Sequence, residues 1–265
     1  IIHIAPVQIM LTLEVWSLLQ RVHNRTTILR IIIKNSGMNL KKSYPVVLTI
    51  AGSESSGGAG IQADLKTFSS LGVYGATAIT AVTAQNTQGV HSQFALSPSM
   101  VIDQINAVLE DIYPSVIKVG MLSDASIAAA VADALKGYSN PIILDPVMVS
   151  SSGHRLLSLE AQSILKERLL PMALLVTPNI PEMEALTSMP VSTNEEKFNA
   201  ACYLLSLGVP AVLLKGGHQE GDSKMDILYQ KSSQGIISTT FSSPTLITSN
   251  IHGTGCTLSS AIAAY

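Results

Sequence analysis

From residue 44 onward, short apolar runs alternate with segments whose apolar residues recur at helical spacing. Residues 46–51 form an apolar run that leads into a Gly/Ser-rich loop, which indicates a buried strand. The apolar residues from Ile61 to Leu71 then recur at helical spacing, and Gly72 ends that helix. The same criteria predict further strands at residues 77–82, 116–119, 141–144, 173–176 and 211–214. They predict further helices at residues 98–111, 123–135, 158–170, 194–207 and 254–265.

This alternation is typical of an α/β fold. It predicts a three-layer, doubly wound and mostly parallel sheet with helices on both faces. Residues 227–229 and 235–240 are expected to form an antiparallel pair at one edge of that sheet. No internal repeat or linker interrupts the pattern, so we expect one domain over residues 38–265. Ligands of such folds bind at the carboxyl ends of the strands, where the polar motifs of this chain fall.

Residues 1–37 differ in composition and pattern from the rest of the chain. They are rich in isoleucine and leucine, carry four basic residues after Glu14, and follow neither a helical nor a strand period. We expect this segment to be an extension outside the native domain, with Met38 as the initiator. A targeting or membrane-surface segment is the alternative.

Composition narrows the function classes. Sixteen basic and 18 acidic residues leave a net charge of −2, which argues against a nucleic-acid partner. Hydrophobic residues make up 47% of the chain, enough for a large core, but no strictly apolar run exceeds six residues, so no membrane span is expected. The chain has two cysteines, Cys202 and Cys256, and this scarcity favours a reducing, cytoplasmic location.

The loop before the last helix carries the most informative motif, Gly253-Thr254-Gly255-Cys256. Two glycines at a helix N-terminus let successive N–H groups converge on one anion, such as a phosphoryl group. A thiol in the first helical turn is expected to have a lowered pKa, so Cys256 could act as a general base. The alternative is an ordinary tight turn around a small buried residue.

Polar residues follow several other predicted strands. Asp145, Asn179 and Glu182 offer oxygen atoms suited to magnesium, and Lys215 precedes two glycines and could reach a nucleotide phosphate. Each could instead be an ordinary solvated or helix-capping residue. Together with the glycine loop they favour phosphoryl transfer from a magnesium nucleotide. Asp64 is expected in the first turn of its helix, where a carboxylate interacts favourably with the helix dipole.

Seven stretches of the chain carry a family resemblance. They are LTIAGSESSGGAGIQADLKTFSSLGVYG, AITAVTAQNTQGV, IKVGML, ILDPVMVSSSGHRLL, TPNIPEMEAL, VLLKGGH and NIHGTGCTLSSAIAA. In this order and spacing, from about Tyr44 to Tyr265, the chain resembles the hydroxymethylpyrimidine/phosphomethylpyrimidine kinases. These form the thiamine-pathway branch of the ribokinase-like superfamily, in which many other members have an aspartate where this chain has Cys256.

The resemblance implies a kinase that uses ATP and Mg²⁺ to phosphorylate 4-amino-5-hydroxymethyl-2-methylpyrimidine and then its monophosphate. It implies Cys256 as the base and a phosphoryl site at Gly253, Thr254 and Gly255. The implied pyrimidine-binding residues are Gln85, Asp64, Gly52, Met121 and Val147. The residues implied to organise the nucleotide and metal are Asn179, Glu182, Lys215 and Asp145, with Asp145 and Glu182 on the Mg²⁺.

Two departures from the family pattern bear on activity. Glu54 stands where the family usually has aspartate, and the chain ends nine residues after Cys256, where the family continues. We therefore expect a domain truncated at its C-terminus. Separately, we expect the chain to form a homodimer. A pyridoxal kinase on the same scaffold is one alternative, because apolar pocket walls distinguish similar flat rings only weakly. A non-catalytic pyrimidine- or phosphate-binding protein, suggested by the truncated end, is the other.

Overall fold

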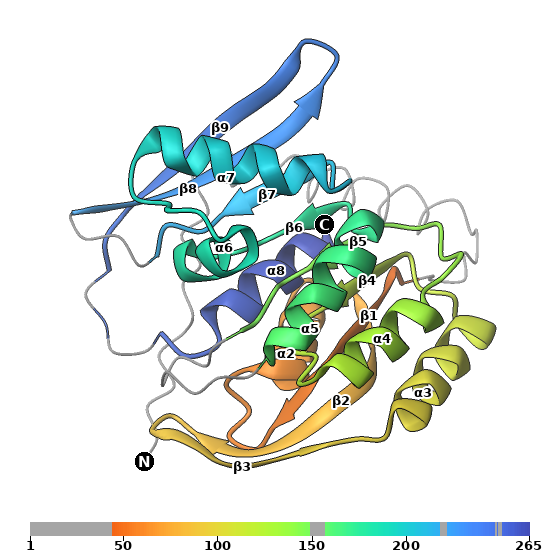
Figure 1. Cartoon of the computed structure of the whole chain (residues 1–265). Coiled ribbons are helices and arrows are strands. Elements are labelled where there is room, and N and C mark those ends of the chain that lie inside the picture. The colour runs from red at the N-terminus through yellow and green to blue at the C-terminus, as the bar shows by residue number, and fades with distance from the viewer. Residues whose placement is uncertain (1–43, 149–156, 218–221, 247, 249–250) are drawn as a thin grey trace, which may run out of the picture.

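The computed structural model describes residues 44–148, 157–217, 222–246, 248 and 251–265 (Figure 1). Within them, nine strands form one sheet in the order β3-β2-β1-β4-β5-β6-β7-β8-β9. The predicted extension at residues 1–37 and the start at Met38 lie outside the described residues. Within the described residues, no helix is both long enough and apolar enough to cross a membrane.

Six neighbouring strands run parallel, which confirms the predicted doubly wound sheet. They are β2 (Tyr74–Asn86), β1 (Val46–Glu54), β4 (Val116–Val119), β5 (Ile142–Leu144), β6 (Leu175–Val176) and β7 (Ala211–Leu214). Chain order reverses between β1 and β4, so their carboxyl ends open a crevice of the kind in which ligands bind. Three antiparallel strands complete the edges: β3 (Gly89–Ala95), β8 (Ser223–Ser232) and β9 (Gly235–Pro244).

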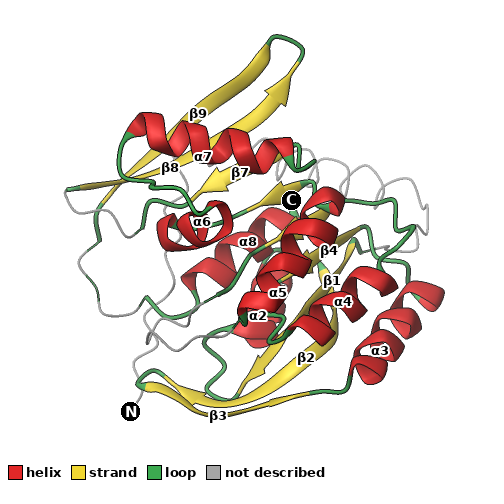
Figure 2. Cartoon of the chain, in the orientation of Figure 1, coloured by secondary structure: helices red, strands yellow, loops and turns green. Residues whose placement is uncertain are grey.

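Helices cover both faces of the sheet, as predicted (Figure 2). On one face lie α3 (Pro98–Asp111), α4 (Ala125–Ala134), α5 (Leu159–Ile164), α6 (Ile180–Thr187) and α7 (Asn194–Ser206). After α5 the chain continues through a π turn at Leu165–Leu169 and a 3₁₀ turn at Leu170–Met172. On the other face, α2 (Gly60–Ser70) packs beside α8 (Thr254–Ala264).

Alternation along the strands divides the core between the two faces. In β4, Ile117 and Val119 join the large cluster beneath α3 to α7. Lys118, between them, must therefore face α2 and α8, because successive side chains of a strand point to opposite faces. Thr49 takes the same direction in β1, between Leu48 and Ile50 of the large cluster. Both polar side chains are fully buried.

Two elements are missing from the sequence prediction. The strand β3 has no fully buried residue, so no apolar alternation marks it. The helix α6 spans eight residues, too few to show a clear helical period. In addition, β1 extends to Glu54, so the Gly/Ser loop begins later than expected. The antiparallel pair at the edge is confirmed, and its strands are longer than predicted.

Candidate active site

The motif loops meet at the carboxyl ends of the parallel strands. Gly253 has φ +78 and caps the N-terminus of α8, and a Cβ there would lie 1.8 Å from the carbonyl oxygen of Gly58. A Cβ at Gly58 would in turn lie 2.4 Å from a ring carbon of His252. The loop after β1 and the loop before α8 therefore touch through these glycines. A larger residue at Gly253 must move the backbone, and one at Gly58 must displace the His252 side chain.

Lys215 stands beside the first turn of α8. Its Nζ lies 2.9 Å from Asp145 Oδ1 and 3.7 Å from Glu182 Oε2. A Cβ at Gly255 would lie 3.4 Å from the same Nζ. The ammonium and the N–H groups of the helix N-terminus thus face one region, which suits an anion.

Asp145 is fully buried and remains ionised. Thr177 and Ser259 donate hydrogen bonds to it, each at 3.1 Å. Burial alone would raise the pKa of Asp145, but the ammonium groups of Lys215 and Lys118 hold it below its ordinary value. The residue is therefore a carboxylate at neutral pH.

Glu182 belongs to a capping box at the start of α6. Asn179 N–H donates to Glu182 Oε2 and Glu182 N–H donates to Asn179 Oδ1, both at 2.8 Å. Burial raises the pKa of Glu182 to about 7, although the nearby Lys215 lowers it. Lys215 is the positive partner of this buried carboxylate, at 3.7 Å, and the carboxylate oxygens are of the kind that Mg²⁺ prefers.

The expected low pKa of Cys256 is wrong. Its side chain is partly buried, and burial raises the pKa of the thiol to about 11. The charge of Lys118 lowers that pKa, but the carboxylates of Asp64 and Asp145 raise it again. The thiol is therefore neutral at pH 7.

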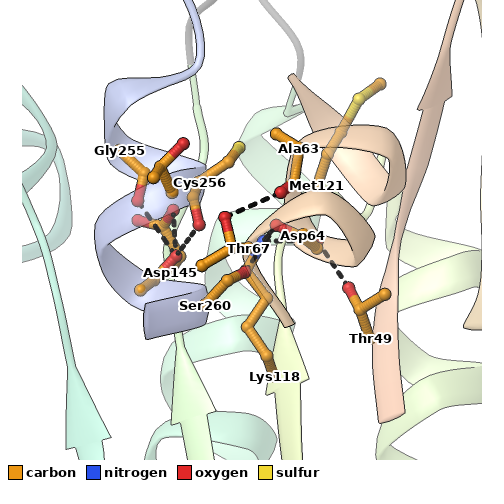
Figure 3. A network of polar contacts seen from close by, with 12 residues as sticks. Thr49, Ala63, Asp64, Thr67, Lys118, Met121, Asp145, Gly255, Cys256 and Ser260 are labelled. Carbon is orange, nitrogen blue, oxygen red and sulfur yellow. Dashed lines mark hydrogen bonds and ion pairs between the residues drawn. The ribbon is translucent and has the colours of Figure 1, made fainter. Parts of the chain in front are cut away.

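Asp64 and Lys118 form a fully buried ion pair beneath that thiol (Figure 3). Lys118 Nζ lies 3.0 Å from both carboxylate oxygens of Asp64, and Thr49 and Ser260 each donate a hydroxyl at 2.6 Å. Asp64 lies beyond the first turn of α2, so its expected interaction with the helix dipole is wrong. Sequence reasoning missed Lys118, although a lysine inside the four-residue strand β4 was a usable signal.

Three of the implied pyrimidine-binding residues lie together. Met121 and Val147 share a small apolar cluster, and a Cβ at Gly52 would lie 3.0 Å from Met121 Sδ. Gln85 lies further along β2, at an irregularity in the pairing of β2 with β3. Ser55 Oγ donates to the backbone carbonyl of Gln85 at 2.7 Å. The binding roles of these residues, and of Asp64, stay predictions.

Glu54, the departure from the family pattern, organises the loop after β1. Its carboxylate accepts hydrogen bonds from the backbone N–H groups of Ser56, Gly58 and Ala59. Burial would raise the pKa of Glu54, but these bonds and the Ser56 hydroxyl lower it overall. The Glu54 carboxylate thus holds the backbone of this loop.

A doubly wound sheet with a glycine-capped helix, a lysine and buried carboxylates at its strand ends defines a small-molecule kinase. Comparison with known proteins identifies the branch. The family model for phosphomethylpyrimidine kinase matches residues 54–265, so the chain belongs to this family.

Individual relatives agree with that assignment. The hydroxymethylpyrimidine/phosphomethylpyrimidine kinase of Escherichia coli K12 is 46% identical over 219 residues, covering 82% of this chain and 81% of the relative. The thiamine biosynthesis bifunctional protein ThiED of Geobacter sulfurreducens is 50% identical over 220 residues, covering 83% of this chain. This chain spans only 44% of that longer relative.

Solved structures give the same picture. The phosphomethylpyrimidine kinase of Clostridium difficile 630 is 44% identical with a TM-score of 0.73, covering 83% of this chain and 90% of that one. The pyridoxal kinase of Staphylococcus aureus in complex with ADP is 32% identical with a TM-score of 0.76, covering 84% and 81%.

Proposed function

We propose that this chain transfers a phosphoryl group from ATP to the hydroxymethyl group of 4-amino-5-hydroxymethyl-2-methylpyrimidine and then to the resulting monophosphate, in thiamine biosynthesis. One observation carries this proposal: Lys215, paired with Asp145, stands against the glycine-lined first turn of α8. Hydroxymethylpyrimidine/phosphomethylpyrimidine kinases more than 40% identical over four fifths of this chain support the choice of substrate.

In this proposal the phosphoryl group lies over Gly253, Thr254 and Gly255 during transfer. The N–H groups of the α8 N-terminus point toward its oxygens, and Lys215 adds a positive charge. Phosphoryl transfer passes through a loose transition state whose charge spreads over these oxygens. Catalysis therefore consists mainly of positioning and electrostatic stabilisation. The fixed glycine loops provide the positioning, and Lys215 provides the positive charge.

Cys256 is proposed to receive the proton of the attacking hydroxyl. With a pKa of about 11, roughly one molecule in 10⁴ carries the thiolate at pH 7. Only this minor thiolate form can accept the proton of the substrate hydroxyl, because a neutral thiol already carries its own. A loose transition state demands little prior activation of the nucleophile, so the proton passes to the Cys256 thiolate as the phosphoryl group arrives, and a small thiolate population suffices.

Glu182 and Asp145 are proposed to hold Mg²⁺, with Asn179 fixing Glu182 through the capping box. Within the described residues no group of three His, Cys, Asp or Glu side chains could enclose a metal. Magnesium needs no such enclosure, because it keeps several waters and uses one or two carboxylates together with substrate phosphates. When bound, the metal neutralises charge on the nucleotide phosphates.

The pyrimidine is proposed to lie against Met121, Val147 and Gly52, with its polar edge read by the amide of Gln85. An amide offers donors and acceptors to one edge of a heterocycle. Pyridoxal is the second candidate acceptor, because the Staphylococcus aureus pyridoxal kinase superimposes with a TM-score of 0.76. Both acceptors are flat rings with a hydroxymethyl group, so the polar groups of the pocket must discriminate between the two substrates.

An ADP-release assay tests the proposal. The chain is supplied with MgATP and either hydroxymethylpyrimidine, its monophosphate or pyridoxal. Turnover with both pyrimidines and little with pyridoxal is expected. Preference for pyridoxal would move the chain to the second candidate, and no turnover with any acceptor would leave a non-catalytic binding protein.

We also propose a homodimer, in a cytoplasm whose reducing conditions suit two free cysteines. Val82 and Phe94 pair across β2 and β3 and are 47% and 73% exposed. An exposed apolar pair at a sheet edge favours a second copy. Light scattering on a sizing column should give twice the monomer mass, and Phe94→Glu should give the monomer mass.

A further inference from the structure

Two consecutive serines of α8 reach two different buried carboxylates. Ser259 Oγ donates to Asp145 at 3.1 Å, and Ser260 Oγ donates to Asp64 at 2.6 Å. Asp145 belongs to the phosphoryl site described above. The second anchor is Asp64, which the family resemblance places among the pyrimidine-binding residues; its carboxylate is fully buried with Lys118, and this pairing needs an explanation of its own.

The ion pair of Lys118 and Asp64 is an unusual choice for this position. Both side chains are 0% exposed, and Lys118 lies on β4 between two apolar core residues. Removing two charges from water is costly, and apolar residues of equal volume are often at least as stabilising as a buried pair. Stability alone therefore does not account for a lysine inside this strand.

The place of the pair relative to Cys256 suggests its use. Ser260 follows Cys256 by four residues, so both side chains lie on the same side of α8, one turn apart. Asp64 thus holds the helix directly below the thiol. Thr49 from β1 and Lys118 from β4 hold Asp64 in turn, so three elements fix one hydroxyl of α8.

We propose that Lys118 and Asp64 form a positioning pair for phosphoryl transfer: through Ser260 they fix the first turn of α8, and with it Cys256 and the N–H groups that face the phosphoryl group. Lys118 is also the positive charge on β4 that faces the thiol. The other charged groups near Cys256 are Asp64 on α2, Asp145 after β5 and Lys215 after β7. This inference rests on the proposed function.

The mildest test removes one hydroxyl. Ser260→Ala cuts the link between α8 and the pair but leaves both charges in place. We expect kcat to fall about 10- to 100-fold, since a misplaced reacting group slows transfer rather than binding. The KM values for ATP and for the pyrimidine should each stay within about threefold of those of the parent. Thr67→Val is the matched control, because Thr67 Oγ1 donates only to the carbonyl of Ala63 on its own helix.

A second test removes the charge. In a Cys202→Ala background, Lys118→Met should slow alkylation of Cys256 by iodoacetamide at pH 9 about tenfold, as loss of a facing positive charge raises a thiol pKa. Asp64→Asn combined with Lys118→Met should slow it less, because Asp64 acts in the opposite direction. This double variant also avoids leaving one unpaired charge buried.

The outcomes separate the inference from the proposed function. If the unmodified chain turns over none of the three acceptors, the proposed function fails, and the alkylation rates still judge the pair. If the chain is active but Ser260→Ala keeps the kcat of Thr67→Val, the positioning role is overturned. Equal alkylation rates for Lys118→Met and the parent would overturn the electrostatic part.

Discussion

The contact between the two glycine loops gives the sharpest prediction. In Gly253→Ala, the new Cβ would meet the Gly58 carbonyl oxygen at 1.8 Å, whereas side-chain carbons essentially never approach within 3.0 Å. The loops must therefore part by about 1.2 Å, the difference between these two distances. A displacement of ~1 Å at a reacting centre costs on the order of 100-fold in rate. We expect kcat in the ADP-release assay to fall by about that factor.

A matched control separates displacement from backbone strain. Gly253 has φ +78, and Gly72 has φ +76 with nothing within 4 Å of an added Cβ. Gly72→Ala therefore imposes the same left-handed conformation without a collision, at a cost of about 1–2 kcal/mol of stability. Its kcat should equal that of the parent. If Gly253→Ala also keeps kcat within about threefold of the parent, the close contact of the loops has no role in transfer.

Three further predictions follow from the site. Cys256→Ser should lower kcat at least about 100-fold with little change in melting temperature, because a serine hydroxyl ionises far less readily than a thiol and so provides far less of the basic form; full turnover would remove Cys256 from proton transfer. The pKa of Glu182 is raised to about 7, so in metal-free buffer its stabilising contribution is complete below pH 4.5 and is lost as pH rises through 7. Glu182→Gln should thus gain stability over the parent between pH 5 and pH 8 in urea unfolding, and parallel curves would contradict this. Gln85→Leu should reduce kcat/KM for the pyrimidine about 10- to 100-fold and bring it closer to the value for pyridoxal; an unchanged ratio between the two acceptors would refute its reading role.

Local sequence patterns predicted most of the fold because they reflect local physics. The helix Pro98–Asp111 and the strands Val116–Val119 and Ala211–Leu214 have the predicted bounds. Their apolar residues face a buried layer, so their spacing records the secondary structure. The strand β3 was not predicted, because none of its residues is fully buried and an exposed edge strand shows no apolar alternation.

The sequence by itself determined the sheet class, the order of the motif loops and the glycines around Cys256, since these depend on spacing along the chain and on backbone freedom. Only the tertiary structure decided which charges meet. Lys118 and Asp64 are 54 residues apart, and their pairing depends on β4 and α2 packing against α8. The raised pKa of Cys256 follows from the same packing, because burial and two carboxylates outweigh the charge of Lys118. Electrostatic effects depend on distance and burial in three dimensions, and no local pattern records either quantity.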